Sequence, residues 1–256
     1  SLYAYDSSWN SYELEFYPAK QNGTIHVNGV GNVSYYESGN AICAPPKLAT
    51  GLTLANGGAI HDVRFTHLNT GISSGAMYSL TNAQFLQCSN ALLTTDAPFY
   101  AGNILLSEVA VAFVGSSFTG AVEHLTYDQG NQITGGTGAS QLALVNSLVT
   151  GVTNNGVITP SFNYTHNLVT GTGVYRAVGG GSYYLDNGST NRDAGTSSIS
   201  AGLLAQLGRK TTYAPIAFTN LTFTIATNFY PQAHRDTNTL DLGYQYDPVD
   251  YSFGCC

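Results

Sequence analysis

A unit of 20 residues that recurs along the middle of the chain limits the fold more than any other feature. Within a unit, apolar residues such as Val63 and Phe65 alternate with polar ones, which is the period of a half-buried strand. A parallel strand pair joined by a helix needs about 30 residues, so the unit is too short for one. The equivalent apolar residues are Ile60 and Leu80, Phe65 and Phe85, Ile72 and Leu92, and Leu148 and Leu168.

Coils of short strands joined by turns satisfy this pattern, and we predict an all-β, right-handed parallel β-helix. Each strand then pairs with its equivalent in the next coil, so like positions form columns with the apolar side chains inside. Asn82 and Asn146 fall at expected bends between strands. They predict a ladder of hydrogen-bonded side chains, and solvated turn residues are the alternative.

The chain divides into three predicted parts. Residues 179–181 are three consecutive glycines, which indicate a flexible break after the coils. The parts are a strand-rich N-terminal flank over 1–58, the β-helix coils over 59–178 and a C-terminal flank over 179–256.

One helix is expected in the C-terminal flank. The pattern predicts it over 199–207, with Ser198 or Ser200 as N-cap and Gly208 as the C-terminal stop. The alternating stretch 218–225 predicts one more strand. Both flanks are therefore irregular but rich in strands.

The charge of the chain argues against two classes of partner. Charged residues make up only 9% of the sequence, and the net charge is −7 with eight Lys and Arg. Such a chain lacks the basic surface that neutralises nucleic-acid phosphates or anionic lipids. It has no apolar run long enough to span a membrane, and no leader pattern opens the chain at Ser1. We expect no nucleic-acid binding and no membrane insertion.

The cysteines and glycosylation triplets indicate an exported chain. A Cys43–Cys88 disulfide, a vicinal Cys255–Cys256 pair and an intermolecular bridge are all compatible with an oxidising compartment. Cys88 alternatively serves as a small buried hydrophobe. We therefore expect an extracellular or cell-surface location. The candidate glycosylation sites are Asn22, Asn32, Asn163, Asn187 and Asn220.

Two motifs near the C-terminus resemble a known family. The segment 189–195 reads STNRDAG, and the segment 240–246 reads LDLGYQY. They resemble the S-x-x-x-D-A-G and D-L-G-x-Y ending of bacterial right-handed parallel β-helix repeat proteins of the pectate-lyase-like superfamily. Together with the coils, the resemblance covers roughly residues 55–250. It implies a β-helix, in a superfamily that holds polysaccharide lyases and hydrolases beside large secreted or surface proteins without assigned catalysis.

No catalytic or cofactor-binding residue is predicted. The polygalacturonase pattern of N-T-D, paired Asp, G-H-G and R-I-K is absent. The densest polar group is His61, Asp62, Arg64 and His67, but strand alternation places His61 opposite Asp62 and Arg64 unless the strand bends. We therefore expect a solvated coil surface there. The segment 71–75 matches G-x-S-x-G, yet no helix is expected after it, so it predicts a turn.

Metal and phosphate sites have little support in the sequence, and no metal-binding residue is predicted. Four carboxylates of the tail, Asp236, Asp241, Asp247 and Asp250, are compatible with calcium. They lack EF-hand spacing, and the alternative to a calcium site is that they are turn residues whose charges lie apart. The glycine-rich segment 135–138 lacks the Lys of a phosphate loop.

The ends of a solenoid and the many tyrosines decide the expected function. Eighteen tyrosines suit sugar stacking, subunit packing or edge packing equally well. Open ends of a solenoid invite further strands, and no amphipathic N-terminal helix is expected to cap them. We therefore predict a structural or adhesive module that binds copies of itself in a fibre or surface array. The alternative is a polysaccharide lyase, a hydrolase or a carbohydrate-binding module.

Overall fold

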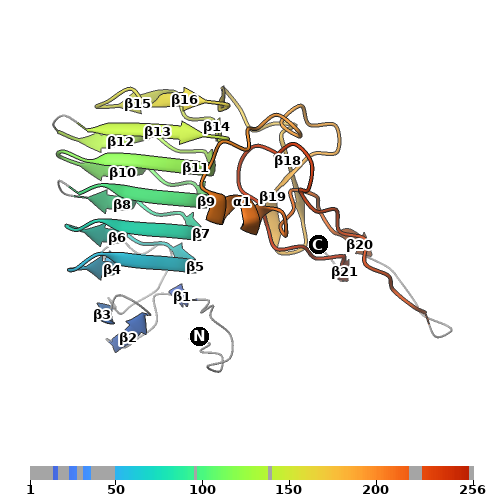
Figure 1. The fold of residues 1–256 in the computed structure, drawn as a ribbon, viewed down its shortest axis with the longest axis horizontal. Helices are drawn as coiled ribbons and strands as arrows, with labels where there is room; N and C mark the ends of the chain where they lie inside the picture. The colour runs from blue at the N-terminus through green and yellow to red at the C-terminus, as the bar shows by residue number, and fades with distance from the viewer. Residues whose placement is uncertain are drawn as a thin grey trace.

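A parallel β-solenoid of about five turns forms the body of the protein, which confirms the predicted parallel β-helix (Figure 1). The computed structural model describes residues 50–94, 97–137, 140–218 and 227–253, and the backbone alone of 14–16, 23–27 and 31–35. The larger sheet contains β5 (Gly58–Thr66), β7 (Tyr78–Leu86), β9 (Phe99–Ser107), β11 (Thr119–Asp128), β13 (Gln141–Val145), β14 (Leu148–Thr150), β16 (Ser161–Asn163) and β17 (His166–Leu168). The second sheet contains β4 (Thr50–Leu54), β6 (Thr70–Ser74), β8 (Asn90–Thr94), β10 (Val111–Gly115), β12 (Gln132–Gly136) and β15 (Asn154–Gly156).

The strand register confirms the 20-residue period of the first coils. Phe65 of β5 pairs with Phe85 of β7, and Ile72 of β6 pairs with Leu92 of β8. The next coils are slightly longer. Three successive pairings, Phe85 with Leu106, Leu106 with Tyr127 and Tyr127 with Val149, are steps of 21, 21 and 22 residues.

The last coil departs from the predicted period. Val149 pairs with Asn167, a step of 18 residues, so Leu148 lies beside His166 and the predicted pairing of Leu148 with Leu168 is wrong. A shorter turn is the reason. Six positions separate Gly156 from Phe162, whereas ten separate their partners Thr134 and Leu144 in the coil before.

The core is a set of stacked columns inside the coils. The rings of Phe65 and Phe85 stack with centroids 5.0 Å apart, and burying a ring of this size stabilises the fold by about 1.5–3 kcal/mol. The hydroxyl of Tyr127 donates to the carbonyl of Val109 at 2.8 Å, so this buried polar group has a partner. Another column contains Ile60, Leu80, Ala101, Val122 and Leu144, all of them at most 3% exposed.

Each coil bends at a residue with left-handed backbone. Most of these residues are not glycine, and a short polar side chain tolerates the conformation through local hydrogen bonds. Within the larger sheet one such bend per coil forms a column: Asp62, Asn82, Asn103, His124 and Asn146, with φ between 51° and 56°. A second column at the end of the same strands contains His67, Gln87, Glu108, Gln129 and Gly151.

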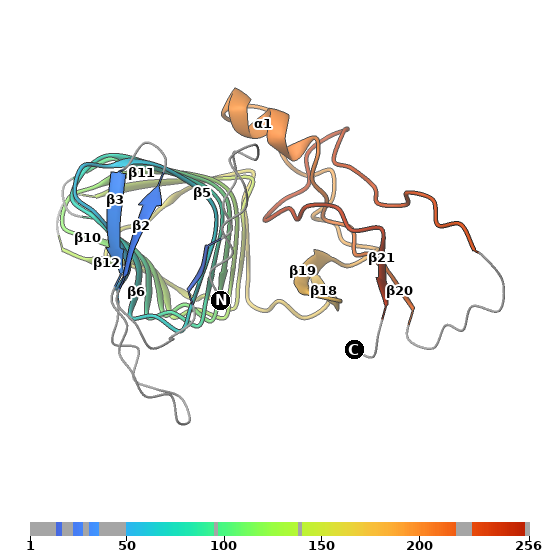
Figure 2. The same ribbon diagram turned by 90° about the horizontal axis from the view of Figure 1, so that it is seen from below.

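The N-terminal end of the solenoid is covered. β1 (Leu14–Phe16) pairs in parallel with β5 and so continues the larger sheet. β2 (Gly23–Val27) and β3 (Gly31–Tyr35) form an antiparallel hairpin. Seen from below, this hairpin crosses the mouth of the coil (Figure 2). The described strands of the N-terminal flank therefore cap this end.

The C-terminal flank lies beside the solenoid (Figures 1 and 2). It begins with an antiparallel hairpin of β18 (Tyr175–Val178) and β19 (Gly181–Leu185), and Gly179, with φ +59°, makes its tight turn. The three glycines of the predicted break at 179–181 therefore lie at the turn of a hairpin, and its flexibility stays a prediction. Helix α1 (Ala201–Leu207) follows, with Ser200 as N-cap and Gly208 as C-cap, close to the prediction. β20 (Ile216–Phe218) and β21 (Tyr251–Phe253) pair in parallel, and the rest of the predicted strand over 218–225 lies outside the described residues.

Candidate functional site

The bend column is where the C-terminal flank joins the solenoid. Asn103 donates to Oδ1 of Asn82 at 2.9 Å, which confirms the predicted ladder at this step. The same Asn103 side chain binds the backbone of Gln245. Two coils on, Asn146 accepts from the backbone N–H of Thr196 at 2.8 Å and donates to its carbonyl at 2.7 Å. The ladder therefore serves as an attachment site.

His124 occupies the ladder between Asn103 and Asn146 as a neutral ring. Its Nδ1 faces the carbonyl of Gly243 at 3.2 Å and must donate, so its Nε2 accepts from Nδ2 of Asn146 at 2.9 Å. Burial lowers the pKa of His124 to about 4, and the Gly243 carbonyl offsets only part of that shift. A second proton on the ring, at Nε2, would point at the side-chain N–H group of Asn146, so two donors would face each other.

Outward side chains of the strands extend the junction. The backbone N–H of Tyr244 donates to Oγ1 of Thr126 at 2.8 Å, and Gln84 donates to the hydroxyl of Tyr244 at 2.8 Å. At the strand ends, Tyr183 donates to the buried carboxylate of Asp128 at 3.1 Å. The segments 189–195 and 240–246 therefore both lie in or beside this junction.

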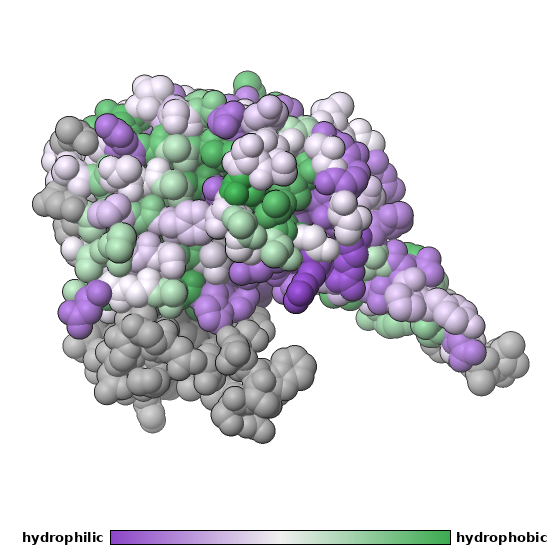
Figure 3. Space-filling model, viewed as in Figure 1, coloured by the Kyte–Doolittle hydropathy of each residue, from purple (hydrophilic) through white to green (hydrophobic). Residues whose placement is uncertain are grey.

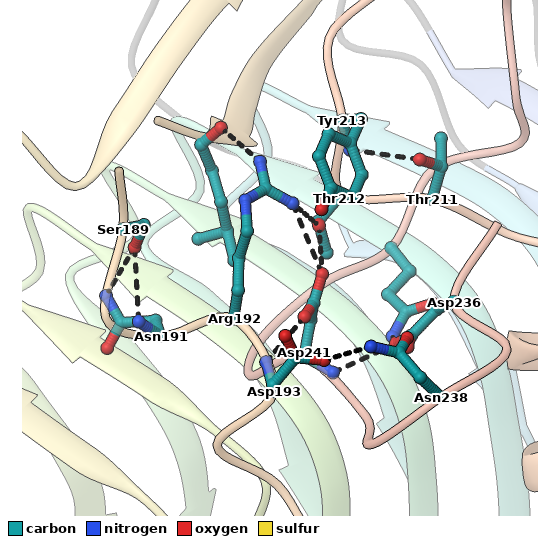
Figure 4. A network of polar contacts seen from close by, with 12 residues as sticks. Ser189, Asn191, Arg192, Asp193, Thr211, Thr212, Tyr213, Asp236, Asn238 and Asp241 are labelled. Atoms are coloured by element: carbon teal, nitrogen blue, oxygen red, sulfur yellow. Dashed lines mark hydrogen bonds and ion pairs between the residues drawn. The ribbon is translucent and has the colours of Figure 1, made fainter. Parts of the chain in front are cut away.

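Inside the flank, Arg192 and Asp241 form a buried ion pair at 3.3 Å (Figure 4). Arg192 also donates to Oγ1 of Thr212 at 2.6 Å and to the carbonyl of Leu185 at 2.8 Å, and its guanidinium stacks 3.6 Å from the ring centre of Tyr213. Thr212 donates to Asp241 as well. Each member has several partners, which is what makes a buried ion pair tolerable.

Two charged members of this network have a buried polar atom without a hydrogen-bond partner, Arg192 at its Nε and Asp236 at its Oδ1. The Oδ2 of Asp236 accepts from the backbone N–H of Asp241 at 2.9 Å and from the side chain of Gln245, while its Oδ1 and Oε1 of Gln245 are buried without a hydrogen-bond partner. Burial raises the pKa of Asp236 to about 6, and the charges of Asp241 and Asp193 add to the rise.

The other tail carboxylates are dispersed. Asp247 pairs with Lys210 at 2.7 Å, and Asp250 accepts from the backbone N–H groups of Gln232 and Ala233, each at 2.7 Å. The described residues contain no group of three or more His, Cys, Asp or Glu side chains arranged to hold a metal ion. Calcium in the tail stays a prediction without a site.

The polar group of the first coil lies on a strand that bends, the alternative left open by the alternation pattern. Asp62 bends the strand, so His61 and Arg64 lie on the outside together while Val63 points into the core. His61 pairs with Asp62 at 2.8 Å, and Arg64 donates to Gln84 at 2.8 Å. The segment 71–75 ends β6 and runs into β7 without a helix, as predicted.

The cysteines and the glycosylation candidates lie in different parts of the structure. Cys88 is buried in the core with its Sγ near the carbonyl of Leu86 at 3.5 Å. Its predicted disulfide stays a prediction, because Cys43, Cys255 and Cys256 lie outside the described residues. Of the glycosylation candidates, Asn187 is exposed in a turn and Asn163 is exposed in β16. Asn32 lies in β3, where only the backbone is described, and Asn22 and Asn220 lie outside the described residues.

The last coil is a second unusual surface. Its strands β15 and β16 end the two sheets, and within the described part of the chain nothing pairs with their outer edges. Phe162 of β16 pairs with Leu144, so it continues an inward column, yet it is 39% exposed while Leu144 is 0% exposed. Val157 and Tyr164 of the same coil are 53% and 55% exposed. Figure 3 shows apolar surface over the upper coils and a more hydrophilic flank.

The fold and these surfaces define a parallel β-solenoid protein with a C-terminal flank attached along its bends. No protein-family model matches the chain, and neither the curated proteins nor the solved structures contain a significant match. Among the described residues, no helix is long and apolar enough to cross a membrane.

Proposed function

We propose that the chain is an extracellular structural or adhesive β-helix module that associates with copies of itself through the last coil of its solenoid. The observation that carries the proposal is the exposure of Phe162. The inward column that it continues is buried in every preceding coil, and Phe162 is exposed because no further coil of the described chain covers it. A second copy is a partner that supplies strands of matching kind.

The charge distribution supports this surface as a contact between copies. No Asp, Glu, Lys or Arg occurs over residues 129–175, although the whole chain carries a net charge of −7. Natural proteins protect edge strands with charged side chains, especially Lys, which this coil lacks. Two such ends therefore approach each other without like charges in contact.

The extracellular placement rests on other features. Asn187 is an exposed turn residue within an N-x-S triplet, as a glycosylation acceptor must be. The resemblance of 189–195 and 240–246 to bacterial pectate-lyase-like repeat proteins favours the secreted, non-catalytic members. This choice rests on two groups of polar side chains. Those around His61 pair or hydrogen-bond with their own neighbours, and those in the tail do the same within the flank.

Sedimentation velocity over a wide range of protein concentration tests the proposal. We expect the average mass to rise with concentration, and to rise further in high salt because salt screens the repulsion between copies of charge −7. A chain that stays monomeric at every concentration and salt level contradicts self-association.

An aromatic cluster at the tip of the flank favours a second candidate, carbohydrate binding. Phe218 stacks on Phe253 with ring centroids 5.5 Å apart, and Phe229 packs edge-on against Phe253 at 5.4 Å. Tyr230 beside them is 68% exposed. Aromatic faces of this kind stack on sugar rings. Retention on insoluble polysaccharides that is lost in Tyr230→Ala would support binding, and equal retention of both proteins would contradict it.

A further inference from the structure

We propose that two copies pair tail to tail, last coil against last coil, in a closed two-fold dimer. The inference rests on the self-association proposed above and adds the orientation of the partner. A head-to-tail fibre requires two complementary open ends, whereas a two-fold dimer requires one self-complementary end. The two ends of this solenoid differ in this respect.

The first coil offers no open end. Ile60, which starts the inward column, is 3% exposed, and Leu52 of the opposite sheet is 1% exposed. β1 continues the larger sheet below them, and the β2–β3 hairpin crosses the mouth of the coil (Figure 2). At the other end of the same column Phe162 is 39% exposed. Among the coils that the structure describes, the last one therefore presents uncovered core and the first does not.

A two-fold axis through the last coil pairs the open strand edge and the exposed ring of one copy with the same groups of the other. It places β16 antiparallel to β16 of the second copy, so that the unpaired backbone groups of one edge satisfy those of the other. Phe162 then covers Phe162 of the second copy. The last coil, from Gly151 to Leu168, comprises 18 residues, against roughly 20–30 residues per side in a stable interface. We therefore expect a dimer of moderate affinity.

A glycan at Asn163 and this dimer exclude each other. Asn163 lies in β16, within the proposed interface, and its side chain is exposed. An attached sugar chain would stand between the two edges. The dimer is therefore a property of chains that carry no glycan at Asn163, and the protein for the test is produced without glycosylation.

Charge substitutions on the last coil test the interface. Phe162→Lys removes the exposed ring and adds a charge to the edge. Asn167→Lys adds the same charge at an exposed polar position that continues the inward column of Val149, with no loss of apolar packing. Thr53→Lys is the matched control, since Thr53 is an exposed strand residue of the first coil. Circular dichroism on heating checks that each variant is folded.

The expected result is a mass that levels off at two chains for the native protein and for Thr53→Lys, with at least a tenfold weaker dimer in both last-coil variants. Continued growth beyond two chains would overturn the tail-to-tail pairing and leave self-association standing. A dimer of unchanged affinity in both folded last-coil variants would also overturn it. A native chain that is always monomeric would overturn both proposals.

Discussion

The side-chain amide of Asn103 binds both backbone groups of Gln245, although 142 positions separate the two residues. Oδ1 of Asn103 accepts from the N–H of Gln245 at 2.7 Å, and Nδ2 donates to its carbonyl at 2.9 Å. Both residues are fully buried. The asparagine thus takes the place of a peptide group in a neighbouring strand, and the flank is attached to the solenoid much as one strand is attached to another.

Asn103→Ala should loosen this attachment. The substitution leaves a buried N–H and a buried carbonyl without partners, which costs about 2–4 kcal/mol of unfolding free energy. Urea denaturation followed by circular dichroism measures the loss. Asn131→Ala is the control, because the Asn131 side chain is exposed, and we expect it to change stability by less than about 0.5 kcal/mol. Equal effects of the two substitutions would contradict the role of the ladder.

His124 should make the fold sensitive to mild acid. Its pKa is about 4 in the folded chain and 6.5 in the unfolded chain, so the unfolded state takes up a proton that the folded state refuses. This contribution to stability is lost as the pH falls from 6.5 towards 4. His124→Asn keeps a ladder amide without the titration, and its melting temperature should fall less on acidification than that of the native chain. Parallel curves would count against this assignment.

Asp236 should act in the opposite direction. Its pKa is raised to about 6 from 3.8, so the folded state binds the proton more readily, and this contribution grows as the pH falls from 6 towards 4. Asp236→Asn should therefore lose stability on acidification more steeply than the native chain. At neutral pH the amide avoids the cost of burying a charge.

Asp250→Asn is the matched control for that comparison. Backbone N–H groups of Ala233 and Gln232 lower the pKa of Asp250, so its contribution is present at neutral pH and is lost in acid. Removing this carboxylate should make the acid loss smaller, the reverse of Asp236→Asn. If both variants shift the pH profile in the same direction, the opposite pKa shifts assigned to the two carboxylates are contradicted.

Gly243→Ala should separate the flank from the solenoid. Gly243 has φ +84°, and an added Cβ would meet Oγ1 of Thr126 at 2.5 Å and Cδ1 of Leu148 at 3.1 Å. Left-handed strain and overpacking together cost about 2–4 kcal/mol. Limited proteolysis should cleave the variant sooner within the flank. Gly188→Ala, with nothing within 4 Å of the added Cβ, should resist like the native chain.

The solenoid was predictable because its signal is local and repeated. Phe65 and Phe85 are equivalent in sequence and stack in space, so a period in the chain reports a contact directly. The final coil was not predictable in detail. The connection between Gly156 and Phe162 is four residues shorter than its counterpart in the coil before, and this shifts the strand register. The composition of the segment does not reveal such a shift.

The junction was only partly predictable. Asn82 and Asn146 were recognised as ladder candidates, but His124 was missed because an imidazole seldom stands in for an amide and nothing in the flanking residues marks it. The partners of the ladder, such as Gln245, are more than 100 positions away from it. Contacts between residues so far apart leave no periodic pattern in the sequence. The two C-terminal motifs were the available signal, and they marked the flank without showing what it binds.

The attachment of one flank to four successive bends limits how such a chain changes length in evolution. Many solenoids gain or lose whole repeats, because each repeat contacts only its neighbours. Here residues of the segment 196–245 bind one bend in each of four consecutive coils: Asn82, Asn103, His124 and Asn146. Inserting or deleting a coil between Asn82 and Asn146 would leave part of the flank without a matching bend. The number of coils over this stretch is thus fixed by a segment that lies outside them.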